Sequence, residues 1–269
     1  LIFDTMGIFW TMKYENEKEA ELLREWKLKP KKTPVKIFVT FGYYEEYESR
    51  GLPAENKFSI NPPELEAEDW ILTFNLEITE PIAVLIERTV TKLKEIQKQY
   101  NIEDIISEIK QDTSSEKETK NSAIGLFEAA RSWKIFSEST TEISELVEGG
   151  KTTVLDLSMY SSVGAFNVRA LVIGLISRKL FKQRMLSRKT EEIEAVQRGI
   201  DYLKFKPKRE MPLVWLFIDE IHEFLEIEGK TPASDSLIQL LREGRQPGIS
   251  LVMATQQPGA LARDAITQA

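Results

Sequence analysis

The sequence predicts an α/β protein whose core is a mostly parallel sheet flanked by helices. Short apolar, β-branched runs occur both early and late in the chain, and helical patterns separate them. Strands that alternate with helices pair in parallel, because each crossover helix returns the chain to the same edge of the sheet. A third indication is residues 212–219, which are apolar at nearly every position. Such a run is typical of a central parallel strand covered on both faces.

The pattern changes twice along the chain, which indicates two parts. Up to residue 41 the elements alternate, from about Gly42 helical patterns dominate, and after Gly149-Gly150 the alternation resumes. We therefore expect a core formed by residues 1–41 and 148–269, with a mostly helical insertion at 42–147. The expected strands are 1–3, 35–40, 152–158, 212–219 and 249–255. The expected helices are 17–26, a helix entered through the turn 61–65, 81–100, 123–136, 163–186, 191–204 and 234–245, with a mobile polar segment at 111–122 and a basic loop at 206–210.

Composition and charge limit the classes of protein to which the chain can belong. The 269 residues can bury a sizeable core, and 42% of them are hydrophobic, which is typical of a globular protein. No cysteine is present, so disulfides and thiolate metal sites are excluded and a cytoplasmic location is expected. No apolar run is long enough for a membrane span. The net charge of −7 argues against nucleic acid binding over the whole surface, although it allows a local basic lining.

An acidic pair follows the most apolar strand pattern, in the sequence VWLFIDEIHEFL of residues 214–225. An aspartate at the end of a buried strand is held rigidly at the sheet edge, where Asp219 can orient the water ligands of a phosphate-bound Mg²⁺. The next side chain, Glu220, points elsewhere and can polarise an attacking water as a general base. A plainer alternative is that the two acids only cap the helix that follows them.

Three further groups of polar residues stand at the ends of predicted elements. In LLREGRQPG, Arg245 could reach a γ-phosphate on a neighbouring subunit. Alternatively, it could be a cation that the helix dipole favours at the C-terminus of a helix, beside a capping Gly244. In MATQQPG, Gln256 and Gln257 could sense the γ-phosphate, although a polar turn is the commoner explanation. In FDTMG, Asp4 would lie at the same edge of the sheet or serve an ordinary turn.

The single histidine and a dense basic run receive plainer interpretations. His222 has no partner histidine, so we expect a packing residue and not a metal ligand. The lysines and arginines of residues 178–189 are expected to form the solvated surface of a helix, although they could also face phosphates.

The order of these signals is more specific than any one of them. A strand followed by Asp-Glu, a helix ending in REGR and a strand followed by TQQP occur in this order within residues 214–258. Together with LIFDTMGIFW and VLDLSMYSS, they resemble the central ATPase domain of HerA-type archaeal and bacterial DNA translocases. That family belongs to the FtsK–HerA branch of P-loop motors, which have a RecA-like fold. The resemblance covers nearly the whole chain and is looser over residues 42–147.

The resemblance implies a role for each candidate residue. Asp219 would be the Walker B aspartate, which supports Mg²⁺ through water, and Glu220 the catalytic glutamate. Arg245 matches the finger that acts on ATP bound by the next subunit, and Gln256 matches the sensor glutamine, with Gln257 adjacent. Asp4 corresponds to the acid that ends the strand after the phosphate-loop helix. Members of this family form hexameric rings that pump double-stranded DNA, often together with a NurA-type nuclease in end resection.

One part of the family's site is absent from the sequence, the phosphate-gripping loop of the form Gly-x-x-x-x-Gly-Lys-Ser/Thr. In the family this loop precedes the LIFD strand, so we expect a segment of a longer protein that hydrolyses ATP poorly by itself. Two alternatives stay open. The chain could be a non-catalytic relative that serves as an oligomerisation or nuclease-docking scaffold. It could also be a DEAH-type helicase, because the sequences DEIH and MAT are similar to two conserved boxes of that family. REGRQPG and FDTMG, which the helicase does not require, favour the translocase.

Overall fold

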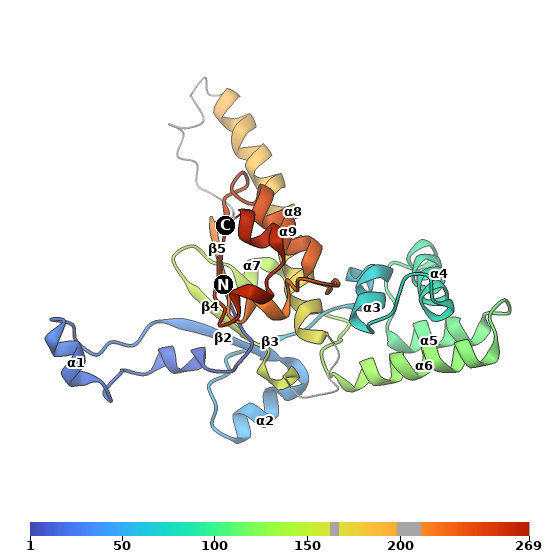
Figure 1. The fold of residues 1–269 in the computed structure, drawn as a ribbon, viewed down its shortest axis with the longest axis horizontal. Helices are drawn as coiled ribbons and strands as arrows, with labels where there is room; N and C mark the ends of the chain where they lie inside the picture. The colour runs from blue at the N-terminus through green and yellow to red at the C-terminus, as the bar shows by residue number, and fades with distance from the viewer. Residues whose placement is uncertain (162–166, 198–210, 269) are drawn as a thin grey trace.

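A computed structural model describes residues 1–161, 167–197 and 211–268, and its centre is a parallel sheet with helices around it (Figure 1). The strands follow the order β3-β2-β4-β1-β5-β6, and every neighbouring pair is parallel. They are β1 (Ile2–Asp4), β2 (Val35–Thr40), β3 (Asn56–Phe58), β4 (Thr152–Asp156), β5 (Val214–Ile218) and β6 (Ile249–Met253). The predicted α/β fold with a parallel sheet is confirmed.

Helices cover the sheet and form most of the remaining described chain. The α-helices are α1 (Ala20–Glu25), α2 (Tyr44–Ser49), α3 (Ala67–Thr73), α4 (Pro81–Ile96), α5 (Ile102–Gln111), α6 (Lys117–Ser132), α7 (Ile143–Leu146), α8 (Val168–Gln197), α9 (Ser234–Glu243) and α10 (Arg263–Gln268). Short 3₁₀ helices are η1 (Phe9–Lys13), η2 (Phe41–Tyr43), η3 (Pro62–Glu64), η4 (Ser158–Tyr160), η5 (Ile221–Glu223) and η6 (Pro258–Ala260). Within the described residues, no helix is both long and apolar enough to cross a bilayer.

The helix α8 corrects the prediction of two separate helices. It runs without a break from Val168 to Gln197, because the expected gap contains neither glycine nor proline. Across that gap, Arg188 pairs with Glu192 one turn later, with Nε and Oε1 2.8 Å apart. The predictions for residues 163–166, for 198–204 and for the basic loop 206–210 fall outside the described residues.

The segment 111–122, predicted to be mobile, is in part helical. The helix α5 ends at Gln111 and α6 already begins at Lys117, because a buried stripe that starts at Ala123 anchors the polar first turns of α6. Neither α5 nor the three-residue strand β3 was predicted from the sequence. A capping box starts α5, in which Asn101 and Asp104 accept each other's backbone N–H groups at 3.1 and 2.8 Å.

The helices α4, α5 and α6 pack on one another at one end of the molecule, away from the sheet (Figure 1). The helix α3 packs between α4 of this group and α8 of the core, and an ion pair fastens α3 to α8. On α8, Arg178 donates to both carboxylate oxygens of Asp69, on α3, at 2.9 and 2.6 Å. Conversely, β3 belongs to the range 42–147 but pairs with β2 in the sheet. The boundaries of the predicted insertion stay a prediction.

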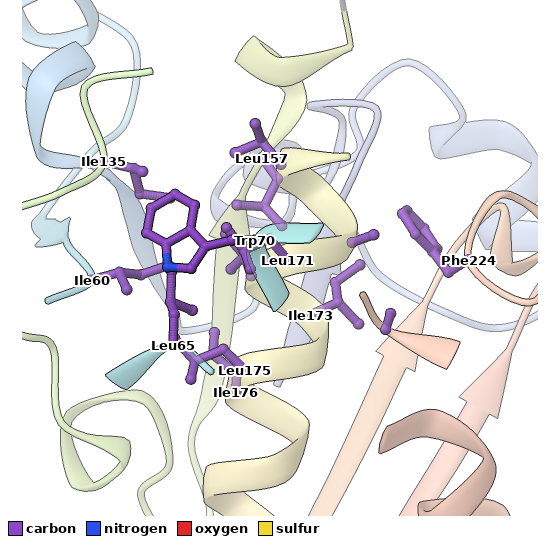
Figure 2. Close-up of a cluster of buried hydrophobic side chains, with 14 of the residues drawn as sticks. Ile60, Leu65, Trp70, Ile135, Leu157, Leu171, Ile173, Leu175, Ile176 and Phe224 are labelled. Atoms are coloured by element: carbon purple, nitrogen blue, oxygen red, sulfur yellow. The ribbon is translucent and has the colours of Figure 1, made fainter. Parts of the chain in front are cut away.

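Two apolar clusters lie on opposite faces of the sheet, because successive strand residues point to opposite sides. On one face, strand residues such as Phe3 and Leu216 belong to the same buried cluster as apolar residues of α8 and α9. This cluster continues into the helical part, where the buried ring of Trp70 lies among Ile60, Leu65 and Ile135 (Figure 2). The other cluster is smaller and lies under η1 and α2; it consists of Ile2, Val35, Ile37, Val39, Tyr47 and Val154.

The prediction that β5 is covered on both faces is wrong. Val214, Leu216 and Ile218 are buried, whereas Trp215 and Phe217 are 59% and 40% exposed. The two aromatic rings stack with their centroids 6.5 Å apart. They lie on the face of the sheet where η1 and α2 cover other strands but leave β5 uncovered. The strand β6 is also incompletely covered, since Ile249 is its only buried residue. A continuous apolar run therefore identified a strand without identifying its coverage.

Candidate functional site

Three strands of the sheet lead to an aspartate at the same edge. Asp4 and Asp156 are the last residues of β1 and β4, and Asp219 directly follows β5. These carboxyl ends share one edge because the strands are parallel and in register, with Asp4 opposite Asp156. Open α/β sheets bind their ligands outside this edge. The fold therefore brings the predicted residues Asp4 and Asp219 to the place where a ligand site is expected.

The turn after β5 forces Glu220 into an unusual backbone conformation. Its φ and ψ are 50° and 43°, in the left-handed region that side chains with a Cβ atom disfavour. The turn is held by Asp219, whose Oδ1 accepts the N–H of Glu220 at 2.9 Å. It is also held by β6, because Ile221 donates its N–H to the carbonyl of Ala254 at 3.0 Å. Strain of this kind concentrates at functional sites.

The carboxylate of Glu220 connects the ends of β5 and β6. Its Oε1 accepts a hydrogen bond from Nε2 of Gln256 at 2.6 Å. Its Oε2 is buried and accepts no hydrogen bond from the described residues, although Nδ1 of His222 lies 3.3 Å away. The side chain of Glu220 is only 12% exposed. A buried carboxylate oxygen without a donor is uncommon in proteins and marks this position as a functional candidate.

The two predicted glutamines have different surroundings. The side chain of Gln256 contacts Glu220, whereas Gln257 contributes only its backbone N–H, which donates to Oγ1 of Thr255 at 3.0 Å. Both glutamines are exposed. The sequence alone did not separate them, and the contact with Glu220 favours Gln256 as the residue that acts together with the acidic pair.

Asp4 is fully buried, and both of its oxygens bind the chain that follows. Oδ1 accepts the N–H groups of Gly7 and Ile8 at 2.7 and 3.1 Å, and Oδ2 accepts that of Phe9 at 2.8 Å. Burial raises the pKa of Asp4, which these N–H groups lower and the nearby Asp156 raises further. The geometry gives Asp4 a role in shaping the loop that follows β1, and its assignment to nucleotide binding stays a prediction.

Asp156 is a site-edge residue that the sequence reasoning missed. Its Oδ1 accepts the N–H and hydroxyl of Ser158 at 2.9 and 2.7 Å, and its Oδ2 accepts the hydroxyl of Tyr47 at 2.9 Å. The hydroxyl of Ser158 leaves no room for a Cβ atom at Gly7, which would lie 2.6 Å from it, and φ there is +70°. The signal was present in the sequence, because VLD repeats the pattern of IFD and FID.

Arg245 lies at the opposite edge of the sheet. It follows α9 and precedes β6, so the whole length of β6 separates it from Gln256. The side chain is exposed and has no hydrogen bond or ion pair with any described residue. Two arginines of α8 hold the turn beside it, since Arg184 donates to the carbonyl of Pro247 at 2.9 Å and Arg188 to that of Gln246. Arg245 therefore cannot reach the Glu220 of its own chain.

The basic run at 178–189 is not merely a solvated surface, as the sequence suggested. Arg178 pairs with Asp69, Lys179 pairs with Glu64, and Arg184 is buried. These cations are used inside the molecule, where they join α8 to the helical part and to the turn before β6. The expectation of a purely solvated helix surface is therefore wrong for these three residues.

The sequence contains two Gly-Lys-Thr tripeptides, and neither can form a phosphate cradle. Residues 150–152 stand where β4 begins, at the edge of the sheet opposite Asp219. Residues 229–231 precede α9, but there Lys230 pairs with Asp235 at 3.0 Å, and the hydroxyl of Thr231 donates to the carbonyl of Phe224 at 2.9 Å. A phosphate loop joins the carboxyl end of a strand to a helix, so residues 150–152 stand at the wrong end of their strand, and residues 229–231 engage their lysine and threonine side chains within the chain.

The free donor atoms at the sheet edge fit a magnesium ion bound mainly by water and phosphate. Only Oδ1 of Asp219 is engaged, while its Oδ2 accepts no hydrogen bond from the described residues. Nowhere in residues 1–161, 167–197 and 211–268 do three or more acids or histidines gather in a metal-binding group. Mg²⁺ is usually held by one or two carboxylates together with phosphate oxygens and water, so this single carboxylate suits it.

A parallel sheet with an Asp-Glu pair and a glutamine at the carboxyl ends of its strands places this protein among the α/β domains that bind their ligands at this edge. The particular family follows from sequence comparison, because the model of the family "Helicase HerA, central domain" matches residues 1–180. The chain belongs to this family of HerA-like ATPase motors. The match includes β1 to β4, whereas Glu220, Arg245 and Gln256 lie beyond it. It favours the HerA resemblance over the DEAH-type alternative.

Solved structures with a similar course of the chain are distant in sequence. VirB4 of Thermoanaerobacter pseudethanolicus is 16% identical with a TM-score of 0.49, over 99% of this chain and 72% of that chain. The bacterial conjugative coupling protein TrwB, in a trigonal form with sulphate, is 12% identical with a TM-score of 0.45, over 99% and 67%. Plasmid coupling protein TrwB in complex with ADP and Mg²⁺ is 12% identical with a TM-score of 0.44, over 94% and 62%. No curated protein sequence matches the chain.

Proposed function

We propose that the chain is the ATP-hydrolysing part of a HerA-like DNA translocase. The observation that carries the proposal is the 2.6 Å hydrogen bond between Gln256 and Glu220. It joins a strand-end carboxylate to a strand-end amide at the edge where α/β domains bind nucleotides. The reaction is the transfer of the γ-phosphoryl group of ATP to water, in which positioning and electrostatic stabilisation supply most of the catalysis.

Asp219 and Glu220 have different roles at this edge, metal binding for Asp219 and base catalysis for Glu220. The free oxygen of Asp219 would hold a Mg²⁺ ion through water, and the metal would supply positive charge against the phosphate oxygens. Glu220 accepts the proton of the attacking water as general base. Since Gln256 occupies Oε1 of Glu220, a sensor amide that turns toward a γ-phosphate frees this oxygen. The same movement relays the presence of the γ-phosphate to the rest of the chain.

Arg245 acts on the nucleotide of a neighbouring subunit. Its exposure and its position at the far edge of the sheet support this role, because a guanidinium from the next subunit can stabilise transition-state charge. The proposal therefore includes a homo-oligomeric ring, with a hexamer as the expected size. A phosphate-gripping loop from outside these 269 residues completes the site, so we expect the 269-residue chain alone to show no robust turnover.

The expected substrate of the motor is double-stranded DNA in repair and end resection, with a NurA-type nuclease as a possible partner. These details rest on the family and not on a contact in the structure. They are tested by comparing ATP hydrolysis by the natural full-length protein with duplex and with single-stranded DNA. Stronger stimulation by the duplex favours a translocase, whereas stronger stimulation by single strands favours a strand-separating helicase.

A second candidate function is a non-catalytic scaffold for oligomerisation or for docking a nuclease. The observation in its favour is that no Gly-x-x-x-x-Gly-Lys-Ser/Thr pattern occurs in the 269 residues. The two functions differ in the natural full-length protein, because only the motor hydrolyses ATP. Absence of turnover in the wild-type full-length protein, with or without DNA, would favour the scaffold.

The variant Glu220→Gln tests the proposed function directly. The amide has the size of the carboxylate but cannot accept the proton, so the full-length protein is expected to retain ATP binding and to lose turnover. ATP binding is measured with a fluorescent analogue, and turnover by phosphate release. Glu226→Gln, at an exposed acid of the same segment, is the matched control and should hydrolyse ATP normally. Normal turnover in Glu220→Gln would refute the proposal.

A further inference from the structure

We infer that His222 is a positioning residue that couples Glu220 to Thr255. This inference rests on the proposed function, since it gives a second partner to the residue assigned there as the base. The sequence suggested a packing residue, but the structure places the imidazole among polar groups at the sheet edge. Its Nδ1 lies 2.9 Å from Oγ1 of Thr255 and 3.3 Å from Oε2 of Glu220.

The position of the imidazole is fixed by both strand ends. His222 belongs to η5, directly after the strained Glu220, and Thr255 follows β6. The backbone ladder continues between the two segments, because Ala254 donates its N–H to the carbonyl of Ile218 at 3.0 Å. The side chains of His222 and Glu220 are 16% and 12% exposed, so water competes weakly for these contacts.

The donors and acceptors allow one nitrogen to serve only one of the two oxygens at a time. Oγ1 of Thr255 accepts the N–H of Gln257 at 3.0 Å, and in the tautomer with an unprotonated Nδ1 the hydroxyl donates its own proton to Nδ1 of His222. When Nδ1 accepts that proton, it has none to offer to Oε2 of Glu220. This arrangement accounts for the buried Oε2 that accepts no hydrogen bond from the described residues.

The contact between His222 and Glu220 therefore depends on the position of Thr255, at the end of β6. If the hydroxyl of Thr255 moves away, the imidazole can adopt the other neutral tautomer, in which Nε2 has given up its proton and Nδ1 carries one, and Nδ1–H is then the nearest donor to Oε2 of Glu220. His222 thereby senses the position of the sensor segment and sets the orientation of the base. Its role is exerted through Glu220, so removing it should lower kcat and leave the affinity for ATP unchanged.

The single histidine of the chain makes a direct measurement possible. In the ¹⁵N-labelled 269-residue protein, the long-range ¹H–¹⁵N NMR spectrum contains only the imidazole of His222. We expect the Nδ1 resonance to shift in Thr255→Val, which removes the hydroxyl, and to stay close to its wild-type position in Thr255→Ser, which keeps it. Glu220→Gln should also shift it. An Nδ1 resonance that is the same in all four proteins would overturn the inference, whatever the protein does with ATP.

Turnover by the natural full-length protein provides the second measurement. Leucine at position 222 fills similar space without polar atoms, and asparagine places an amide close to the position of Nδ1. Because small misplacements of a catalytic group can cost about a hundredfold in rate, we expect His222→Leu to lower kcat at least about tenfold at unchanged KM for ATP. His222→Asn should recover most of the loss. Equal rates in His222→Leu and in the wild type, or a loss confined to KM, would contradict the assignment.

The two proposals fail in different ways. If the wild-type full-length protein does not hydrolyse ATP, or if Glu220→Gln hydrolyses it normally, the proposed function fails. If both behave as expected but His222→Leu is fully active, only the inference about His222 fails. Should His222→Leu not fold, Thr255→Val gives the same test, because it removes the partner and leaves the imidazole in place. It is then expected to lower kcat, and a wild-type kcat would overturn the coupling.

Discussion

Glu220 combines two unfavourable features in one residue. Its left-handed backbone, with φ of 50°, costs a residue with a Cβ atom about 1–2 kcal/mol. Its buried Oε2 also lacks a hydrogen bond from the described residues, which costs further free energy of folding. Natural sequences break local rules mainly at functional sites, where the side chain is selected for something other than stability. Stability alone would place glycine at position 220.

This reasoning predicts that glycine at position 220 stabilises the fold relative to alanine. Glu220→Ala removes the carboxylate but keeps the strained backbone, whereas Glu220→Gly removes both. We expect the free energy of unfolding, measured by urea denaturation, to be about 1 kcal/mol higher for Glu220→Gly than for Glu220→Ala. Neither variant should hydrolyse ATP in the full-length protein. If Glu220→Gly were the less stable of the two, the left-handed conformation would not be a source of strain.

Substitution of Asp4 is expected to destabilise the fold. Its two oxygens accept three backbone N–H groups in a fully buried position. Asparagine offers only one oxygen, so Asp4→Asn leaves a buried N–H group unpaired, and we expect a loss of about 1–3 kcal/mol in the free energy of unfolding. Asp235→Asn, at an exposed acid that pairs with Lys230 on the surface, is the control and should change it little. Equal losses in the two variants would contradict the loop-shaping role.

For single residues, the location of the candidate catalytic side chains was easier to predict than their hydrogen-bond partners. The order of the apolar runs was enough to expect Asp219, Glu220 and Gln256 at one edge, because parallel strands share their carboxyl ends. The environment of His222 could not be predicted, since its main partner, Thr255, is 33 residues away in sequence. An isolated histidine beside apolar residues has the same local pattern whether its ring packs or binds.

The element α8 does more than cover the sheet. Arg184 is 1% exposed and donates to the carbonyls of Pro247 and Met211 at 2.9 and 2.8 Å. It also lies 3.3 Å from Oε1 of Glu191 on the same helix. The segment before β5 and the turn before β6 are thus fastened to one helix. This turn carries Arg245, so α8 fixes the place from which Arg245 extends.

Removing this buried cation should be costly. Arg184→Met keeps a long side chain but leaves two carbonyls without their donor, and we expect a loss of about 3–5 kcal/mol in the free energy of unfolding. Lys182→Met, at an exposed position of the same helix, should change stability by less than about 0.5 kcal/mol. Both values are measured by urea denaturation of the 269-residue chain. A small effect of Arg184→Met would show that the turn is held without Arg184.

At the element scale, periodicity predicted the existence of elements better than their surroundings. The strand β2 has its predicted ends, Val35 and Thr40, because a β-branched run is bounded by a proline and a turn. The continuity of α8 was missed because polar residues in its middle were taken for a break. The exposure of Trp215 was missed because an apolar run does not tell which face of a strand another element covers.

For the whole molecule, the decisive feature is that the proposed catalytic groups occupy two edges of one sheet. Asp219, Glu220 and Gln256 lie at the carboxyl edge, whereas Arg245 lies at the amino edge, before β6. Five residues of an extended strand span roughly 16 Å at about 3.3 Å per residue. A guanidinium at that distance cannot stabilise charge at the site of its own chain. With the role proposed for Arg245, a complete site needs two subunits in head-to-tail contact, as in a cyclic ring.

This geometry predicts that two inactive variants restore activity when they are mixed. In the full-length protein, Glu220→Gln lacks the base but offers an intact Arg245, and Arg245→Ala lacks the finger but offers an intact base. In rings assembled from equal amounts, about a quarter of the interfaces combine the two intact groups, because each is contributed independently with a probability of about one half. Phosphate release by the co-refolded mixture should rise to a corresponding fraction of the wild-type rate, while a mixture of Glu220→Gln with the double variant stays inactive. An Arg245→Ala ring that is fully active by itself would exclude the finger, and a mixture no more active than its components would place Arg245 and Glu220 in the same site of one chain.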